Sequence, residues 1–322
     1  MTDHATAVAH PNIALVKYWG KRDAAMSLPA TGSLSMTLDV FPTRTTVTVD
    51  AGLAADVLEL DGRVLEGTPL DRVARFLDLV RELAGDDRRA RVATTNAVPT
   101  GAGLASSASG FAALAVAASA AYGLDLSPRD LSRLARRGSG SASRSIVSGV
   151  AVWHAGDGDE TSFAEPTEAP DMAMVIATVE EREKPISSRA AMARTAETSP
   201  FYPAWVSDTS ATLERMVDAC AAHDLDLVGR IAETNALRMH ALIQSCDPPI
   251  RYLTAASLAV LDRVEALRAD GTLAYSTIDA GPNVVVLCAP ADAERIAASL
   301  ADVASTVVAR PGPGAHLVED DA

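Results

Sequence analysis

A glycine- and serine-rich run near residue 100 has the composition of a loop that binds phosphate groups. It reads PTGAGLASSASG over residues 99–110 and lies between a β-type run and a long alanine-rich run. Gly101 and Gly103 permit a tight turn close to a ligand. A helix that starts after them would offer free N–H groups, and Ser106 and Ser107 would add hydroxyls. We therefore predict an anion site for nucleotide phosphates; an ordinary turn with serine caps is the alternative.

Two lysines stand out in the run NIALVKYWGKR at residues 12–22. The chain has 28 basic residues, of which only Lys17, Lys21 and Lys184 are lysine and the other 25 are arginine. Because a compact ammonium differs chemically from a planar guanidinium, lysines placed beside Tyr18 indicate a specific role. The alternative is a lysine pair on a solvated helix or strand face.

An aspartate and an arginine complete the set of residues that could do chemistry. Asp279 precedes a Gly-Pro turn that leads into a buried type of strand, where a simple turn cap is the alternative. Arg144 lies in GSGSASRS at residues 138–145, whose small residues predict a backbone nest for an anion. The alternative is a flexible linker, against which the strand-like run at 146–153 argues.

The charge balance limits the ligands that the chain can bind. With 42 acidic residues, the net charge is −14, which disfavours nonspecific binding to nucleic acid. An anionic ligand therefore needs local clusters of positive charge. The sequence contains three of these clusters: Lys17/Lys21/Arg22, Arg136/Arg137/Arg144 and Arg182/Lys184/Arg189.

Cysteine, histidine and hydropathy patterns predict no metal centre and no membrane segment. Cys220, Cys246 and Cys288 form no CxxC pair, and the 6 histidines show no ligand spacing. An odd number of widely spaced cysteines fits a reducing cytoplasm. No apolar run reaches the length of a membrane span, and the N-terminus does not have the pattern of a signal peptide.

Hydrophobic periodicity predicts the elements that position these residues. In the first half we expect strands at 43–50, 57–60, 91–96, 146–153 and 172–179, helices at 70–83, 106–122 and 127–138, and a surface loop at 155–170. In the second half we expect helices at 188–196, 203–222, 226–245, 252–269 and 291–303, strands on both sides of Asp279 and through 307–308, and a frayed acidic tail.

Six segments, taken together and in order, resemble the mevalonate diphosphate decarboxylase family of the GHMP kinase superfamily. They are PNIALVKYWGKR (11–22), LPATGSLSMTL (28–38), PTGAGLASSASGFAAL (99–114), RRGSGSASRS (136–145), EREKPISSRAAMARTAETSPFY (181–202) and YSTIDAGPN (275–283). One position departs from the family pattern, because Ser143 stands where the family usually has cysteine.

The resemblance implies an α+β, two-domain GHMP kinase fold with the site in the cleft. Residues 1–180 would form an ATP-binding domain like ribosomal protein S5 domain 2, and residues 181–322 a ferredoxin-like domain. It implies phosphorylation of mevalonate 5-diphosphate on its 3-hydroxyl by ATP. Loss of phosphate and CO2 would then give isopentenyl diphosphate. A homodimer is implied, and Mg2+ would arrive with ATP rather than on a protein site.

The resemblance also implies roles for individual residues. Asp279 would orient or deprotonate the 3-hydroxyl, Lys17 would lie near Asp279, and Arg144 would bind the substrate carboxylate. Substrate binding would involve Tyr18, Lys21, Arg72, Ser139, Ser141, Arg144, Ser187, Ser188 and Arg189. ATP would contact Pro99, Gly101, Gly103, Leu104, Ala105, Ser106 and Ser107.

Two other functions remain open at this point. One is a superfamily kinase that phosphorylates a mevalonate-like alcohol and stops there. The other is an ATP-binding or scaffold protein without catalysis. The presence of Lys17, Arg144 and Asp279 in one chain favours the decarboxylase.

Overall fold

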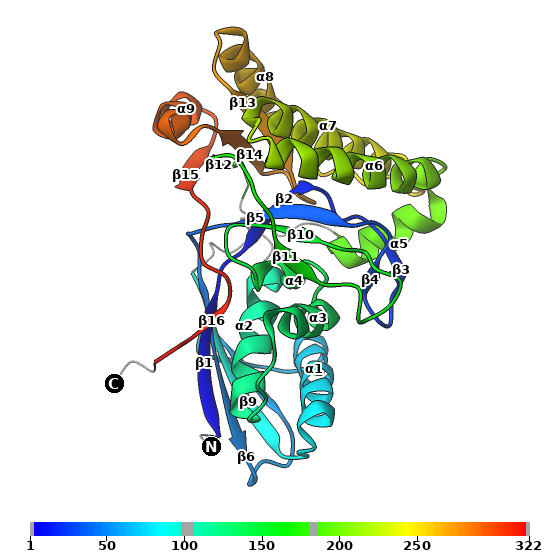
Figure 1. The fold of residues 1–322 in the computed structure, drawn as a ribbon, viewed down its shortest axis with the longest axis vertical. Helices are drawn as coiled ribbons and strands as arrows, with labels where there is room; N and C mark the ends of the chain where they lie inside the picture. The colour runs from blue at the N-terminus through cyan, green and yellow to red at the C-terminus, as the bar shows by residue number, and fades with distance from the viewer. Residues whose placement is uncertain (1–2, 98–105, 181–185, 320–322) are drawn as a thin grey trace.

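The computed structural model describes residues 3–97, 106–180 and 186–319, and Figure 1 shows their arrangement. A six-stranded sheet with the order β16-β1-β6-β9-β7-β8 dominates one end of the molecule. Its strands are β16 (His316–Val318), β1 (His4–Ala9), β6 (Thr43–Asp50), β9 (Arg89–Asn96), β7 (Val57–Leu60) and β8 (Arg63–Leu65). A turn at Asp61 and Gly62 joins β7 to β8 as an antiparallel hairpin.

Three helices cover one face of this sheet, namely α1 (Thr68–Ala84), α2 (Ser106–Ala121) and α3 (Pro128–Gly138). In β6, buried and half-buried residues alternate, as a strand with one face on a core requires. Helix α2 consists mainly of alanine and other small residues and is buried along most of its length. Small side chains allow α2 to pack closely on β1 and β6, so its N-terminus is held at a fixed position over the sheet.

A second antiparallel sheet has the order β11-β10-β5-β2. Its strands are β11 (Ala164–Pro166), β10 (Val150–Trp153), β5 (Ser33–Thr37) and β2 (Asn12–Val16), and the short pair β3 (Lys21–Asp23) and β4 (Leu28–Pro29) lies beside it. One-turn helix α4 (Ala142–Ser145) precedes β10. This sheet carries on its strands, or just after them, several residues of the predicted site.

The third sheet has the order β13-β14-β12-β15. Its strands are β13 (Ala274–Ile278), β14 (Val284–Cys288), β12 (Ala173–Thr178) and β15 (Ser305–Ala309). One apolar cluster joins it to the second sheet and to helices α6 (Tyr202–Ala221) and α7 (Leu225–Gln244). Another joins it to α8 (Ala255–Ala269) and α9 (Ala293–Leu300), while α5 (Ser188–Thr198) packs beside α7. A short 3-10 turn, η1 (Pro290–Asp292), leads into α9.

The structure differs from the predicted elements around Arg144 and in the segment that follows it. Residues 142–145 form α4 rather than an open nest, because the N–H groups of Ala142, Ser143 and Arg144 donate to carbonyls three residues earlier. Strand β10 therefore begins at Val150, not at residue 146. The predicted surface loop at 155–170 contains β11, which pairs with β10. No helix of the described ranges is long and apolar enough to cross a membrane.

The chain crosses between its two halves more than once. Strand β12 precedes residue 180, yet it pairs with β14 and β15, so the third sheet takes strands from both sides of that position. After β15 the chain returns to the first sheet, where β16 pairs with β1. These crossings tie the two halves together around the second sheet.

Candidate functional site

A buried ion pair lies where the second and third sheets meet. Lys17 directly follows β2 and Asp279 directly follows β13, and their Nζ and Oδ1 atoms are 2.6 Å apart. The lysine side chain is 2% exposed and the aspartate side chain 29%. Burial lowers the pKa of Lys17, and the Asp279 carboxylate acts in the opposite direction. The proximity expected for these two residues is confirmed, and only the carboxylate can reach an incoming molecule.

Arg144 lies nearby on α4 with its side chain fully buried. Its Nη1 donates to Ser33 Oγ at 2.5 Å, and its Nε donates to Ser35 Oγ at 2.9 Å and to Asn12 Oδ1 at 3.2 Å. Its guanidinium carbon lies 5.6 Å from the Trp153 ring centroid. Burial lowers the pKa of Arg144 to about 10. Neutral oxygens thus hold the guanidinium in a fixed orientation.

Within the described ranges, no carboxylate lies within 4.0 Å of the Arg144 guanidinium. A buried cation without a counterion is costly unless an anion joins it. The arrangement is therefore suited to bind a carboxylate or phosphate.

Sequence reasoning did not single out Asn12, Ser33 and Ser35, the residues that orient Arg144. The sequence does contain a signal for the two serines. They lie two positions apart in a run with β character, so both side chains are on the same face of β5. Asn12 sits at the start of β2, and its amide also donates to Ser145 Oγ at 2.8 Å. Nothing in its local sequence predicts a contact with a residue 132 positions away.

Three cations from distant parts of the chain form a cluster, which we call the cation cluster: Lys21 on β3, Arg72 on α1 and Arg189 on α5. Burial, followed by the charges of Arg189 and Arg72, lowers the pKa of Lys21 to about 8. Burial and Arg189 also lower the pKa of Arg72, to about 10. Among the described residues, no carboxylate forms an ion pair with any of the three. Their mutual repulsion favours binding of a multiply charged anion.

Arg144 and Arg189 are both close enough to Tyr18 for their charges to act on the pKa of its hydroxyl. Its ring packs edge-on against Trp153, with centroids 4.9 Å apart. A Cβ on Gly140 would lie 2.8 Å from the Tyr18 ring, so glycine is needed there. The hydroxyl is buried without a hydrogen-bond partner in the described part of the chain, and burial raises its pKa.

A row of hydroxyls connects α2 with α4. Ser107 Oγ lies 3.3 Å from Ser139 Oγ, which lies 3.4 Å from Ser141 Oγ. Ser187 caps α5, where its side chain accepts from the N–H of Ala190, and Ser188 is the first residue of that helix.

The nucleotide loop itself is mostly outside the described residues. This applies to Pro99, Gly101, Gly103, Leu104 and Ala105, and to the side chain of Ser106. Helix α2 begins at Ser106, in agreement with the predicted loop-to-helix junction. In the described ranges, no group of three or more His, Cys, Asp or Glu residues could hold a metal ion.

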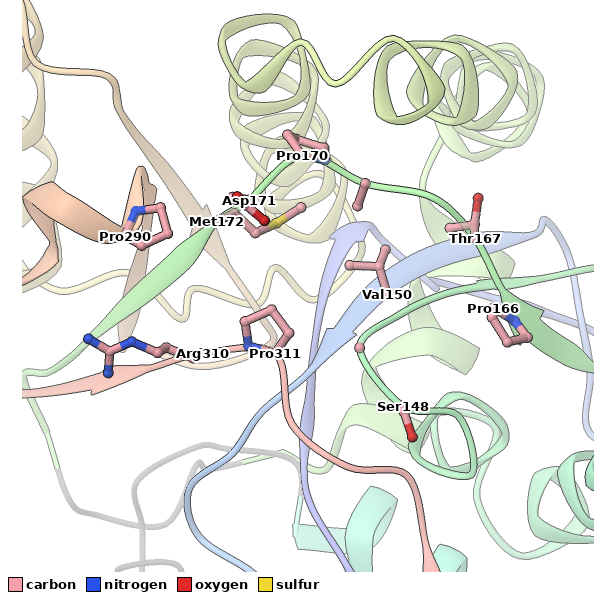
Figure 2. A pocket seen from close by; sticks show the side chains of 12 residues that line it. Ser148, Val150, Pro166, Thr167, Pro170, Asp171, Met172, Pro290, Arg310 and Pro311 are labelled. Carbon is pink, nitrogen blue, oxygen red and sulfur yellow. The ribbon is translucent and has the colours of Figure 1, made fainter.

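Two cavities flank this region. One of about 210 Å³ lies against the first turns of α2, between Arg72 on α1 and strands β7 and β9, and has mainly apolar walls such as Leu58, Leu60 and Leu114. The other, of about 400 Å³, is shown in Figure 2 and lies between β10, β11 and the ends of β12 and β15. No predicted site residue lines the second cavity.

Comparisons with known protein families agree along the chain. Residues 9–164 match the model of a diphosphomevalonate decarboxylase-like N-terminal domain. Residues 174–310 match the model of a mevalonate 5-diphosphate decarboxylase C-terminal domain. The diphosphomevalonate decarboxylase of Ganoderma lucidum is 37% identical, over 88% of this chain and 77% of that protein. The human diphosphomevalonate decarboxylase is 35% identical, over 87% of this chain and 76% of that protein.

Solved structures agree with these matches. The mevalonate diphosphate decarboxylase of Staphylococcus aureus has a TM-score of 0.95 and 40% identity, over 99% of both chains. A structure described as MDDEF in complex with MVAPP, AMPPCP and magnesium has a TM-score of 0.94 and 46% identity, over 98% of this chain and 99% of that one. The expected α+β, two-domain GHMP kinase fold is therefore confirmed. By domain models, relatives and fold alike, the chain belongs to the diphosphomevalonate decarboxylase family.

Proposed function

We propose that this protein converts mevalonate 5-diphosphate and ATP into isopentenyl diphosphate, ADP, phosphate and CO2, as a step in isoprenoid biosynthesis. The observation that carries the proposal is the buried Lys17–Asp279 pair beside Arg144, a guanidinium without a carboxylate partner among the described residues. A carboxylate that can reach an alcohol and a cation that can bind an acid are the two groups that this reaction requires.

Asp279 acts on the tertiary 3-hydroxyl. Hydroxide is a poor leaving group from a tertiary carbon. Phosphorylation of the 3-hydroxyl replaces it with phosphate, which is a good leaving group. Phosphoryl transfer depends mainly on positioning and charge neutralisation. The exposed part of Asp279 accepts the hydroxyl proton or its hydrogen bond, while the ion pair with Lys17 holds the carboxylate in place.

Arg144 binds the substrate carboxylate and orients the bond that breaks. The electron pair of the bond between the carboxyl carbon and C2 forms the C2–C3 double bond, CO2 departs, and the 3-phosphate leaves with its bonding electrons. Neutral hydroxyls from Ser33 and Ser35 hold the guanidinium without competing for it as a carboxylate would.

The cation cluster binds the diphosphate of the substrate. Lys21, Arg72 and Arg189 supply positive charge that lacks a carboxylate counterion in the described structure. Further polar contacts come from Tyr18, Ser139, Ser141, Ser187 and Ser188. These residues lie between β2 and β3, between α3 and α4, and at the start of α5, so they come from both halves of the chain.

ATP binds where α2 begins, and the described residues fit this role. The N-terminal N–H groups of a long buried helix point toward the phosphates, with Ser107 on its first turn. The adjacent cavity of about 210 Å³ has mainly apolar walls, which suit a nucleotide base. The nucleotide supplies the phosphoryl group, with Mg2+ on its phosphates, and residues 99–107 hold it.

Several broader features belong to the same proposal. We assign residues 1–180 to the nucleotide-binding domain and 181–322 to the second domain, with β12 and β16 crossing between them. We also propose a homodimer in the cytoplasm. The three cysteines are free and buried, as is usual in a reducing compartment.

One coupled assay tests the activity. ADP, inorganic phosphate and CO2 are measured with mevalonate, its 5-phosphate and its 5-diphosphate. We expect all three products in equal amounts with the 5-diphosphate. Formation of ADP with a stable phosphorylated alcohol and no CO2 would identify a kinase instead. No ADP from any of the three would identify a protein without this catalysis.

A further inference from the structure

Helix α7 contacts both members of the Lys17–Asp279 pair through side chains that the proposed chemistry does not otherwise use. Asn235 Oδ1 accepts from the backbone N–H of Lys17 at 2.7 Å. His240 Nε2 lies 3.2 Å from the backbone carbonyl oxygen of Asp279. Asn235 and His240 are 1% and 2% exposed; the hydrogen bond to Asn235 is buried, and the contact from His240 is partly buried.

The backbone of Asp279 needs such a contact because it lies beyond the sheet. The ladder between β13 and β14 ends at the pair Ile278–Val284, one residue before Asp279. The turn that follows contains Gly281 and Pro282. A carboxylate at the end of a strand shifts when its own backbone shifts, and the contact from His240 fixes that backbone to a long helix.

The ring of His240 acts as a neutral donor. Burial, followed by the nearby Lys17 ammonium, lowers the pKa of His240 to about 4. The ring therefore carries one N–H at neutral pH. A carbonyl oxygen can only accept a hydrogen bond, so the hydrogen of the neutral ring must be on Nε2, the nitrogen that faces the Asp279 carbonyl. A neutral donor also avoids a second positive charge that would compete with Lys17 for the Asp279 carboxylate.

Asn235 fixes the other partner. Pairing between β2 and β5 shifts register between Ala14 and Val16, so the strand is irregular just before Lys17. The Asn235 Nδ2 atom is buried without a partner among the described residues, which costs stability. An apolar residue of similar shape would avoid that cost, so the useful part of the amide is the acceptor that meets Lys17.

From these contacts we infer that Asn235 and His240 are positioning residues, through which α7 sets the distance between Lys17 Nζ and Asp279 Oδ1. The inference rests on the proposed function, because it assigns the pair to the 3-hydroxyl. It extends that function to two residues that need not touch either substrate.

The test compares variants of α7 by steady-state kinetics and thermal melting. We expect His240→Leu to lower kcat by about 10–100-fold, with KM for both substrates changed by less than about threefold. Glutamine can place its amide N–H near the position of Nε2, so His240→Gln should recover most of that loss. Val228→Ala is the matched control, since Val228 is a fully buried residue on the first turn of α7. It should lower the melting temperature and leave kcat unchanged.

A double-mutant cycle adds a second measurement. If Asn235 and His240 act on one ion pair, Asn235→Leu with His240→Leu should lower kcat by less than the product of the two single effects. Wild-type kcat in His240→Leu would overturn the inference. So would equal loss in His240→Gln and His240→Leu, a loss confined to KM, or a loss explained by the unfolded fraction.

Nitrogen-15 NMR of the histidine side chains gives a readout that does not depend on activity. We expect the neutral, Nε2-protonated form of His240 throughout pH 6–8. A charged ring or an Nδ1-protonated ring would contradict the inference even for a wild-type protein without decarboxylase activity. That lack of activity would itself reject the proposed function, so the two failures are distinguishable.

Discussion

At the scale of single residues, the unusual feature is a buried guanidinium surrounded by neutral oxygens. Ser33, Ser35 and Asn12 satisfy the hydrogen bonds of Arg144 without adding a negative charge, and the more distant Asp279 offsets its positive charge only in part. Surface arginines in this chain instead pair with carboxylates, as Arg238 does with Asp208. The burial of Arg144 therefore lowers the stability of the free protein, and binding of an anionic substrate offsets this loss.

Replacement of Arg144 separates the two halves of the reaction. We expect Arg144→Gln to reduce turnover far more than it reduces ATP affinity, because the substrate carboxylate loses its partner. Arg144→Lys should also be poor, since an ammonium cannot form two parallel hydrogen bonds. The measurements are kcat and KM for each substrate, with circular dichroism as a control for folding. A loss seen mainly as a raised KM for ATP would contradict the carboxylate role.

Replacement of Asp279 tests the chemistry at the hydroxyl. Asp279→Asn keeps the shape but removes the charge that faces Lys17. We expect turnover to fall by about 10³-fold, within the range for loss of general-base help, while nucleotide affinity barely changes. Single-turnover ADP formation with the 5-diphosphate measures this. Retention of more than about a tenth of wild-type turnover would reject the role.

Lys21 gives a pH dependence with a definite sign. Its pKa is lowered to about 8 in the free protein, so the positive charge is present below that pH and is lost above it. Diphosphate binding requires the charged form, and KM for mevalonate 5-diphosphate should therefore rise as pH increases through 8. Lys21→Arg keeps its charge and should remove this rise. A flat KM in the wild type between pH 7.5 and 9.5 would contradict the assignment.

At the scale of elements, two serines at helix N-termini allow an effect on stability to be told apart from an effect on catalysis. Ser127 caps α3 by accepting from the N–H of Asp130, far from the proposed phosphates. Ser107 lies on the first turn of α2 and is linked to Ser139. Both lie at helix N-termini, yet only Ser107 adjoins the predicted nucleotide loop.

We expect Ser107→Ala to lower turnover and raise KM for ATP, because the phosphate site loses a hydroxyl. Ser127→Ala should cost about 1 kcal/mol of stability and leave activity intact. Kinetics and thermal melts of both variants are compared. If Ser107→Ala shows only the stability loss, Ser107 is a helix cap rather than a ligand of ATP.

The elements also show what a sequence can and cannot predict. The helices that became α6 and α7 follow from apolar periodicity, and Ser127 with Pro128 marks the start of α3, because these signals are local. The α4 turn was predicted as a nest, since both forms use the same small residues. His240 and Asn235 were missed because their partners lie 39 and 218 positions away, and no local pattern reports such contacts.

At the scale of the whole molecule, the last strand ties the two halves together. Strand β16 pairs with β1 through Thr6–Val318, Ala7–Leu317 and Val8–His316. On the way there, the Ala315 N–H donates to the Ser145 carbonyl, next to Arg144. The C-terminal segment therefore covers an edge of the first sheet and braces the turn that carries Arg144.

Removal of residues 315–322 should expose the edge of β1 and loosen α4. We expect a loss of stability on the order of 1–3 kcal/mol and a greater tendency to aggregate. Leu317→Ser is the control, because it keeps the backbone pairing and changes a side chain that is already 52% exposed. Thermal melts and light scattering measure both variants. An unchanged melting temperature in the truncated protein would contradict this role for β16.

The pairing of β16 with β1 has a consequence for how the protein is made. Strand β1 acquires one of its two neighbours, β16, only after residues 10–315, which separate the two strands, have been synthesised. Until then, one edge of the nascent first sheet stays open to pairing with other chains. Translation speed and chaperone binding during the synthesis of the residues between β1 and β16 should therefore influence the yield of active enzyme more than they would in a protein whose domains are contiguous.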